Sequence, residues 1–139
     1  MSINLELNWA GGMKGTGHIK GDDFSADVAI PAALGGKGTG TNPKELFVAS
    51  TAACFLATLA AISEGKKLPV ESLSVDTVGD EGKDTFTIRH TAHVTLQNGS
   101  DADAVAKAIE IVAAADKMCA VGNIARKAGV EIEATADIK

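Results

Sequence analysis

The sequence predicts a single domain of the α+β class, with antiparallel strands and a long central apolar helix. Three observations support this prediction. Stretches of alternating apolar residues occur in both halves of the chain, one long apolar helix stands between them, and no repeat or linker divides the 139 residues. A chain of this length supports one core more readily than two. We therefore expect one domain over residues 1–139.

The first forty residues are expected to form a small antiparallel meander. Apolar residues alternate over 3–9, 16–20 and 24–30, and glycine-containing turns separate these runs. The glycine-rich stretch 34–41 suits neither a helix nor a strand and predicts a loop. This loop leads into the central helix.

A long helix is predicted from Asn42 to Gly65. Asn42 is a favourable N-cap, Pro43 suits the first helical position, and the Glu45 carboxylate can reach back to the cap. Apolar side chains cover almost the whole circumference, so the helix has to be enclosed on every side. One chain of this size rarely supplies enough cover, and we expect a homodimer with this helix near its interface. A monomer that holds the helix in the cleft of its own curved sheet is the alternative.

The rest of the chain is predicted as a hairpin, two helices and a last strand. Strands are expected over 71–79 and 85–97, with a turn near 80–83. A helix is expected to open at Ser100 and to end just before Cys119. A short helix over 121–128 and a strand over 130–138, with a glycine stop between them, complete the prediction.

Charge and composition exclude several classes of function. The 13 basic and 18 acidic residues give a net charge of −5, and aromatic content is 4% with no Tyr, so nucleic-acid binding is not expected. The N-terminus lacks the basic and apolar regions of a secretory signal. The apolar stretch 46–62 is short for a membrane span and is interrupted by Ser and Thr. We expect a cytoplasmic protein that does not bind a membrane.

The two cysteines, Cys54 and Cys119, are the strongest candidates for reactive residues. A static disulfide between them is disfavoured in a reducing compartment, so they are either inert core thiols or reactive ones. A Cys within an Ala-rich buried helix is most often a small apolar side chain. A metal site is not expected, because His18, His90 and His93 are scattered and the paired spacings of zinc sites are missing. For these three histidines a structural role is favoured over catalysis.

The sequence around both cysteines resembles the OsmC/Ohr family, the osmotically inducible and organic hydroperoxide resistance proteins. The order of the elements matches over nearly the whole chain, and three blocks carry the resemblance: Gly40-Thr41-Asn42-Pro43-Lys44-Glu45-Leu46-Phe47, Ala52-Ala53-Cys54-Phe55 and Ala115-Asp116-Lys117-Met118-Cys119-Ala120-Val121-Gly122-Asn123. The resemblance implies an α+β fold built as an intertwined homodimer. The central helices of two subunits would lie between the sheets, with the active sites at their interface.

The resemblance also implies a thiol peroxidase of the oxidative stress response. Cys54 would attack a hydroperoxide and become a sulfenic acid, and Cys119 would resolve it to a redox-active disulfide. An apolar pocket would favour organic hydroperoxides, such as those of fatty acids, over hydrogen peroxide. No bound cofactor is implied, and the external reductant would be a dithiol, in this family typically a protein-bound dihydrolipoyl group.

The residues that activate the thiol in this family do not match here. In the organic hydroperoxide branch an Arg and a Glu flank the reactive thiol, but this sequence has Met13 or Lys14 at the Arg position and Lys44 at the Glu position. Lys14 and Lys44 are candidate activating cations, since any cation favours a thiolate, and ordinary solvated lysines are the alternative. Arg126, one of only two arginines, follows Cys119 by seven residues, or two helical turns, and is a further candidate.

This mismatch keeps a second class of function open. A family member without the Arg and Glu could retain both thiols as a redox switch, or keep an apolar pocket for a small ligand, and have no catalytic activity. Turnover of an organic hydroperoxide distinguishes the two classes.

Overall fold

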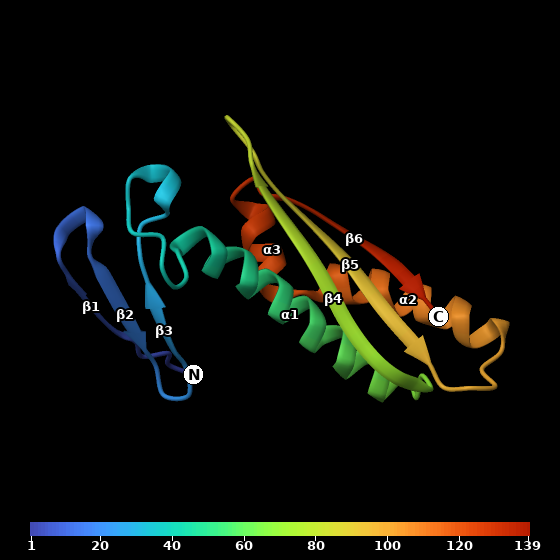
Figure 1. The fold of residues 1–139 in the computed structure, drawn as a ribbon. Helices are drawn as coiled ribbons and strands as arrows, with labels where there is room; N and C mark the ends of the chain where they lie inside the picture. The colour runs from blue at the N-terminus through green and yellow to red at the C-terminus, as the bar shows by residue number, and fades with distance from the viewer. The chain divides into compact units, whose positions relative to one another are not determined.

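The computed structural model describes residues 1–139, which form two compact units, Met1–Phe47 and Val48–Lys139. Figure 1 shows the order of strands and helices along the chain. The α+β class predicted from the sequence is confirmed, because two separate sheets and three α-helices occupy different stretches of the chain. A single domain over residues 1–139 stays a prediction.

The N-terminal unit contains the predicted antiparallel meander, in the order β1-β2-β3. Its strands are β1 (Glu6–Ala10), β2 (Thr16–Lys20) and β3 (Ser25–Val28). Gly17 is paired with Trp9, and a Cβ atom on Gly17 would lie 2.7 Å from the indole Cε3 atom. Only glycine therefore lets the Trp9 ring lie across β2. The indole N–H donates to the Gly12 carbonyl at 2.8 Å and fixes the ring over the β1–β2 turn.

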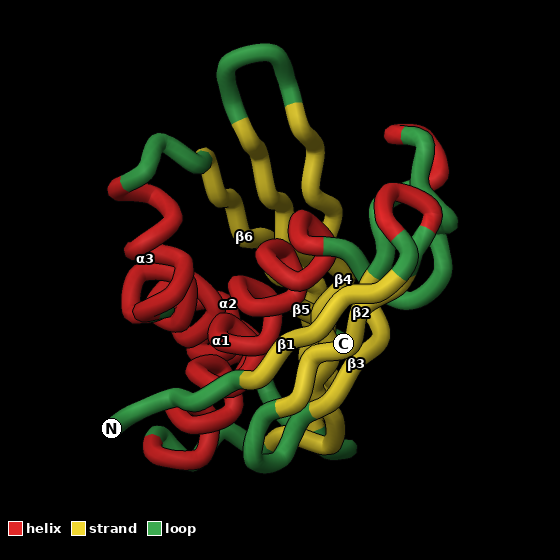
Figure 2. Tube along the Cα trace, turned by 90° about the vertical axis from the view of Figure 1, so that its left-hand side faces the viewer, coloured by secondary structure: helices red, strands yellow, loops and turns green.

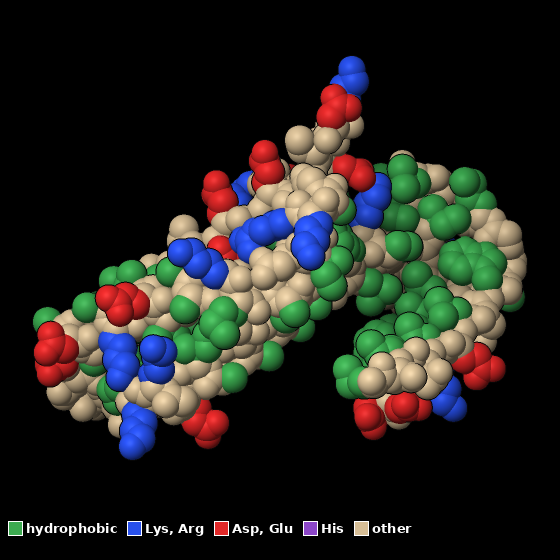
Figure 3. Space-filling model, turned by 180° about the vertical axis from the view of Figure 1, so that it is seen from behind, with side chains coloured by type: hydrophobic (Ala, Val, Ile, Leu, Met, Phe, Trp, Pro, Cys, Tyr) green, Lys and Arg blue, Asp and Glu red, His purple; other side chains and the backbone are tan.

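Large apolar side chains of the N-terminal unit remain exposed. Trp9 is 44% exposed and Leu7 is 60% exposed, and Figure 3 shows hydrophobic side chains gathered over this unit. The other exposed large apolar residues of this unit include Ile3, Leu5, Met13, Phe24 and Leu34. A contiguous apolar surface of this kind is typical of an interaction surface.

The central helix α1 (Pro43–Gly65) begins where the sequence predicts. The side-chain oxygen of Asn42 accepts the Glu45 N–H at 3.0 Å, which confirms the N-cap. The Glu45 carboxylate does not complete the expected capping box. It accepts a hydrogen bond from the Thr41 hydroxyl at 2.7 Å instead.

Only one face of α1 is buried within the chain, so the expected enclosure on every side is absent from the single chain. The buried residues of this face are Thr51, Phe55, Leu59 and Ser63. By length and composition alone α1 could also cross a membrane. Phe55 and Leu59, however, are fully buried in the hydrophobic core of the protein, and we interpret α1 as a core helix.

The second sheet has the order β4-β5-β6. Its strands are β4 (Val70–Glu81), β5 (Phe86–Leu96) and β6 (Glu131–Ile138). β4 and β5 form the predicted antiparallel hairpin, with a turn over 82–85. β6 runs parallel to β5, because two helices lie between these strands and return the chain to the same end of the sheet. The sheet is therefore mixed, a refinement of the antiparallel sheets expected from the sequence.

Two further helices connect β5 to β6, namely α2 (Ala102–Met118) and α3 (Ala120–Lys127). Asp101 caps α2 by accepting the Ala104 N–H at 3.0 Å, so the predicted start at Ser100 is wrong by one residue. The Ser100 hydroxyl donates to the Gln97 carbonyl instead. Figure 2 shows the helices of this unit on one side of the β4-β5-β6 sheet, where Phe55, Val94, Ile111 and other apolar residues form the core.

Candidate active site

Cys54 lies on the partly buried side of α1, against the core of the C-terminal unit. The next residue, Phe55, is fully buried and stacks on the His90 ring of β5 with a centroid distance of 4.9 Å. His90 is itself 2% exposed and shares a 2.8 Å hydrogen bond between its Nδ1 atom and the Thr77 hydroxyl. This stack fixes the rotation of α1 and with it the direction of the Cys54 side chain.

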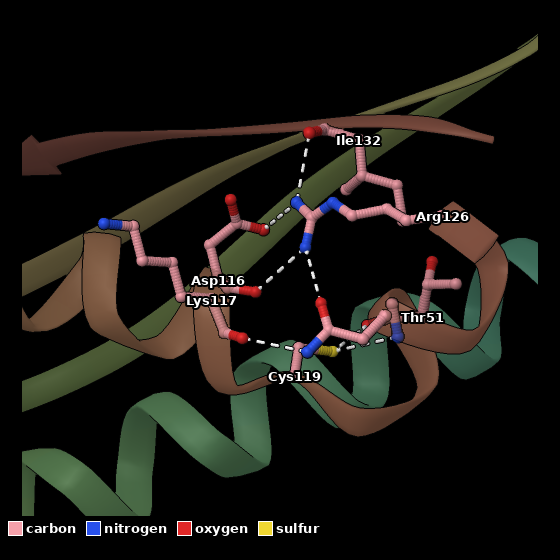
Figure 4. Close-up of polar contacts among 8 residues, drawn as sticks. Thr51, Asp116, Lys117, Cys119, Arg126 and Ile132 are labelled. Carbon is pink, nitrogen blue, oxygen red and sulfur yellow. Dashed lines mark hydrogen bonds and ion pairs between the residues drawn. The ribbon is translucent and has the colours of Figure 1, made fainter. Parts of the chain in front are cut away.

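Cys119 forms the junction between α2 and α3 and is 2% exposed. Its sulfur caps α3 by accepting the Gly122 N–H at 3.4 Å, and its S–H group donates to the Thr51 carbonyl of α1 at 3.8 Å (Figure 4). Gly122 leaves room for this arrangement, because a Cβ atom there would lie 3.2 Å from the sulfur. Cys119 is therefore held against α1, one helical turn before Cys54.

The structure places the two thiols close enough to interact, and their pKa values shift in opposite directions. Burial by itself raises the pKa of Cys54. The pKa of Cys54 nevertheless lies below its ordinary value, because its neighbours outweigh burial. These neighbours are the backbone of Val121, the side chains of Cys119 and Thr58, and the backbone of Ala120. Cys54 is therefore the sulfur of the pair that ionises more readily.

Burial also raises the pKa of Cys119, and here the overall shift is upward. The Gly122 N–H acts in the opposite direction, while the neighbouring Cys54 and the Asp116 carboxylate add to the rise. Cys119 is therefore held as a neutral thiol beside a sulfur that favours the thiolate. Such a pair supplies a nucleophile and a protonated partner thiol in contact with each other.

Arg126 lies on α3 and binds groups on both sides of Cys119. Its guanidinium donates to the Asp116 carboxylate at 2.7 Å and the Asp116 carbonyl at 3.1 Å, and also to the Asn123 side-chain oxygen and the Ile132 carbonyl, both at 3.1 Å. Figure 4 shows these contacts joining the end of α2, α3 and β6. We call this set, Asp116, Asn123, Arg126 and Ile132, the Arg126 brace.

Comparison with known proteins agrees with this geometry. The family model described as OsmC-like protein matches residues 36–135. The chain is 31% identical to the uncharacterized protein YmaD of Bacillus subtilis, with 97% of this chain and 93% of that protein covered. The chain belongs to the OsmC/Ohr family.

Other OsmC/Ohr proteins are similar in sequence and in structure. The organic hydroperoxide resistance protein OhrB of Bacillus subtilis is 36% identical, over 74% of this chain and 76% of that protein. The crystal structure of an organic hydroperoxide resistance protein OsmC from Legionella pneumophila superposes with a TM-score of 0.67, at 26% identity and with 96% of each chain covered. The fold and family predicted from the residues around the two cysteines are confirmed.

The candidate activating cations of this OsmC/Ohr chain belong to three different elements. Lys14 ends a short 3-10 helix in the N-terminal unit, and Lys44 stands in the first turn of α1. Arg126 is part of the brace behind Cys119. The groups that lower the pKa of Cys54 in the structure are hydrogen-bond donors of α3, Cys119 and Thr58. An activating role for Lys14, Lys44 or Arg126 by direct charge stays a prediction.

Sequence reasoning missed Thr58 and the brace partners Asp116 and Asn123. Thr58 stands four residues after Cys54, a spacing that places both on one face of a helix, and its hydroxyl lies 2.8 Å from the Cys54 carbonyl oxygen. Asp116 and Asn123 flank Cys119 within the motif, and two polar side chains on either side of the thiol were the available signal. Both residues bind Arg126, however, and the position of Arg126 depends on the packing of α3 on β6.

The predicted structural histidines are each held by neighbouring polar groups. His90 lies in the core as its apolar register predicts, and burial lowers its pKa. His93 lies on the opposite face of β5, where Asp76 and Asp137 each bind one ring nitrogen at 2.8 Å. His18 pairs with Asp27 in the N-terminal unit. None of these contacts reaches either cysteine.

Proposed function

We propose that this OsmC/Ohr protein is a two-cysteine thiol peroxidase that reduces organic hydroperoxides. The observation that supports this function is the contact between Cys54, whose pKa is lowered, and Cys119, whose pKa is raised. A thiolate nucleophile beside a protonated thiol is the arrangement that a peroxide-reducing pair requires. The organic hydroperoxide resistance proteins among its relatives support the same function.

The proposed reaction balances in three steps. The Cys54 thiolate attacks the distal oxygen of the hydroperoxide, the O–O bond breaks, and the alkoxide leaves as an alcohol after taking a proton, which makes Cys54 a sulfenic acid. The Cys119 thiol then displaces the sulfenic oxygen as water and forms a disulfide. A dithiol, a dihydrolipoyl protein or another of the same class, reduces the disulfide and is itself oxidised. We place this cycle in the cytoplasm, where reducing conditions restore both thiols.

Organic hydroperoxides suit the surroundings of Cys54 better than hydrogen peroxide does. Cys54 packs against a core of Phe, Leu, Ile, Val and Ala side chains, and Ile62 lies on the same helix, two turns further on. A hydrocarbon tail would gain about 25 cal/mol for each Å² of still-exposed apolar surface that it removes from water. Hydrogen peroxide has no tail and gains nothing from this burial.

A homodimer forms part of the proposal. Most of the α1 surface is open in the single chain, and an open cleft of about 470 Å³ beside it is lined by residues of α1 and β4. The Ser63 hydroxyl is buried at the edge of this cleft and has no hydrogen-bond partner. A second copy of the chain would cover the apolar faces of α1 and of the N-terminal unit. Light scattering that returns the mass of a monomer would contradict this assembly.

A non-catalytic redox switch is the second candidate. Met13 or Lys14 and Lys44 stand where the organic hydroperoxide branch carries its Arg and Glu, so the polarisation of the peroxide by a guanidinium is missing at those positions. Such a protein would still form the disulfide between Cys54 and Cys119, but it would not complete repeated turnovers under saturating reductant.

The test follows the consumption of cumene hydroperoxide with dihydrolipoamide as the reductant. We expect multiple turnovers by the native protein, none by Cys54→Ser, and a single equivalent of peroxide consumed by Cys119→Ser, because its sulfenic acid cannot be resolved. The Cys119→Ser variant is the matched control, since it keeps the nucleophile and loses only resolution. A native protein that stops after one equivalent under saturating dithiol would support the switch and refute the peroxidase.

A further inference from the structure

The first turn of α3 presents its backbone N–H groups to both sulfurs. Gly122 donates to the Cys119 sulfur at 3.4 Å, while the backbone N–H groups of Ala120 and Val121 are among the groups that lower the pKa of Cys54. The N-terminal end of a helix carries a partial positive charge, because its first N–H groups have no partner within the helix. A thiolate on Cys54 is therefore stabilised by backbone N–H groups.

This arrangement depends on how α3 is held. The helix has only eight residues, and its start is a junction with a single residue, Cys119, between two helices. A helix this short has little stability of its own, so contacts with its neighbours determine its position. A small displacement of its first turn would move the N–H groups away from Cys54.

The Arg126 brace supplies these contacts from the other end of α3. Arg126 binds the Asp116 side chain and carbonyl on α2, and it reaches the Ile132 carbonyl on β6. Asn123 continues the network by donating to the Lys117 carbonyl at 2.9 Å. The side chains of Arg126 and Asp116 are 30% and 22% exposed, so this charge-assisted pair is partly shielded from water. The brace thus fixes the α2–α3 junction from both sides (Figure 4).

We propose that Arg126 is a positioning residue, which holds the first turn of α3 against the Cys54 sulfur so that backbone N–H groups stabilise the thiolate. The guanidinium acts through the brace, since its hydrogen bonds go to Asp116, Asn123 and Ile132. The consequence for turnover rests on the proposed peroxidase function, but the effect on the thiol itself does not.

Few titratable groups face this site, so the ionisation of Cys54 can be followed by itself. On α1 between Val48 and Ser63, Cys54 is the only titratable residue. The neighbouring elements contribute Cys119 at the junction, Asp116 on α2, Arg126 on α3 and His90 on β5. Burial lowers the pKa of His90 below its ordinary value.

The test measures the rate at which iodoacetamide alkylates Cys54 as a function of pH, with peptide mass spectrometry to separate Cys54 from Cys119. Arg126→Gln is expected to lower the rate at pH 7 by roughly 3- to 10-fold, and Arg126→Lys by less, because Lys keeps the ion pair but not the planar set of contacts. Arg89→Gln is the matched control, since it removes the other arginine and its exposed pair with Asp80. The pH dependence of Cys54 alkylation in Arg89→Gln should equal that of the native protein.

Asp116→Asn distinguishes positioning from direct charge, because the two roles predict opposite signs. If Arg126 acted as a plain cation, the loss of the Asp116 negative charge would favour the Cys54 thiolate and speed alkylation. If Arg126 acts through the brace, Asp116→Asn loosens the junction and slows alkylation. Faster alkylation in this variant, or an unchanged profile in folded Arg126→Gln, overturns the proposal.

A second variant covers the case in which Arg126→Gln does not fold. Asn123→Ala leaves the ion pair with Asp116 in place and removes only the links to Arg126 and Lys117. It should slow alkylation of Cys54 in the same direction by a smaller factor, and a native profile would overturn the proposal. If the native protein shows no peroxidase turnover while these thiol profiles shift as expected, the proposed function fails and the positioning role stands.

Discussion

The Cys119 side chain helps to lower the pKa of Cys54, and this effect leads to a prediction that depends on one atom. Cys119→Ala removes the thiol group that helps to lower the pKa of Cys54. Hydrogen bonds to charged groups contribute about 1.5–3 kcal/mol, and because S–H is a weak donor and Cys54 is partly exposed, we take about 1 kcal/mol. At 1.36 kcal/mol for each factor of ten, this corresponds to an about fivefold smaller thiolate population below the midpoint. Cys119→Ser restores a donor and is the matched control.

The assay is the alkylation of reduced protein by iodoacetamide between pH 4 and pH 10, followed by mass spectrometry. We expect Cys119→Ala to react about five times more slowly than the native protein at neutral pH. Cys119→Ser should stay close to the native rate. Circular dichroism would confirm that both variants keep their helices. Equal rates for the Ala and Ser variants would refute the reasoning, because only the donor distinguishes them at this position.

Three further predictions concern stability and resolution. Phe55→Ala opens a cavity beside the His90 ring and should lower the free energy of unfolding by about 3–5 kcal/mol in urea titrations. A loss below about 1 kcal/mol would contradict the stacked core. Burial lowers the pKa of His90 from 6.5, so the unfolded chain binds more protons than the folded one. The free energy of unfolding should therefore fall as the pH drops below about 6.5. His90→Gln should flatten this dependence on pH. Gly122→Ala places a Cβ atom 3.2 Å from the Cys119 sulfur and should slow peroxide-driven disulfide formation several-fold in stopped-flow thiol assays.

The raised pKa of His93 predicts the opposite dependence of stability on pH. Hydrogen bonds that the His93 ring donates to Asp137 and Asp76 raise its pKa, so its contribution to stability is fully present below pH 6.5 and is lost as the pH rises through the raised pKa. His93→Asn should therefore cost more stability at pH 6 than at pH 8. Urea unfolding at both values measures this difference, and an equal loss would show that the two carboxylates do not bind the protonated ring.

Local features of the fold were predictable from the sequence because they depend on neighbouring residues. The Asn42 cap, the long helix from Pro43 and the helix end just before Cys119 follow from capping chemistry and apolar spacing. The capping residue of α2 was misplaced by one position, since Ser100 and Asp101 are both good caps and only the backbone direction selects Asp101.

By itself the sequence determined the class of fold, the family and the two sulfurs worth attention, because capping residues, periodicity and motif spacing act over short distances along the chain. Tertiary structure alone decided which groups meet. It made β6 parallel to β5, seated the Cys119 thiol on the Thr51 carbonyl, and gave Arg126 its partners on α2 and β6. These contacts join residues that are distant in the sequence, and the ionisation of Cys54 depends on them because hydrogen bonds act over about 3 Å in space.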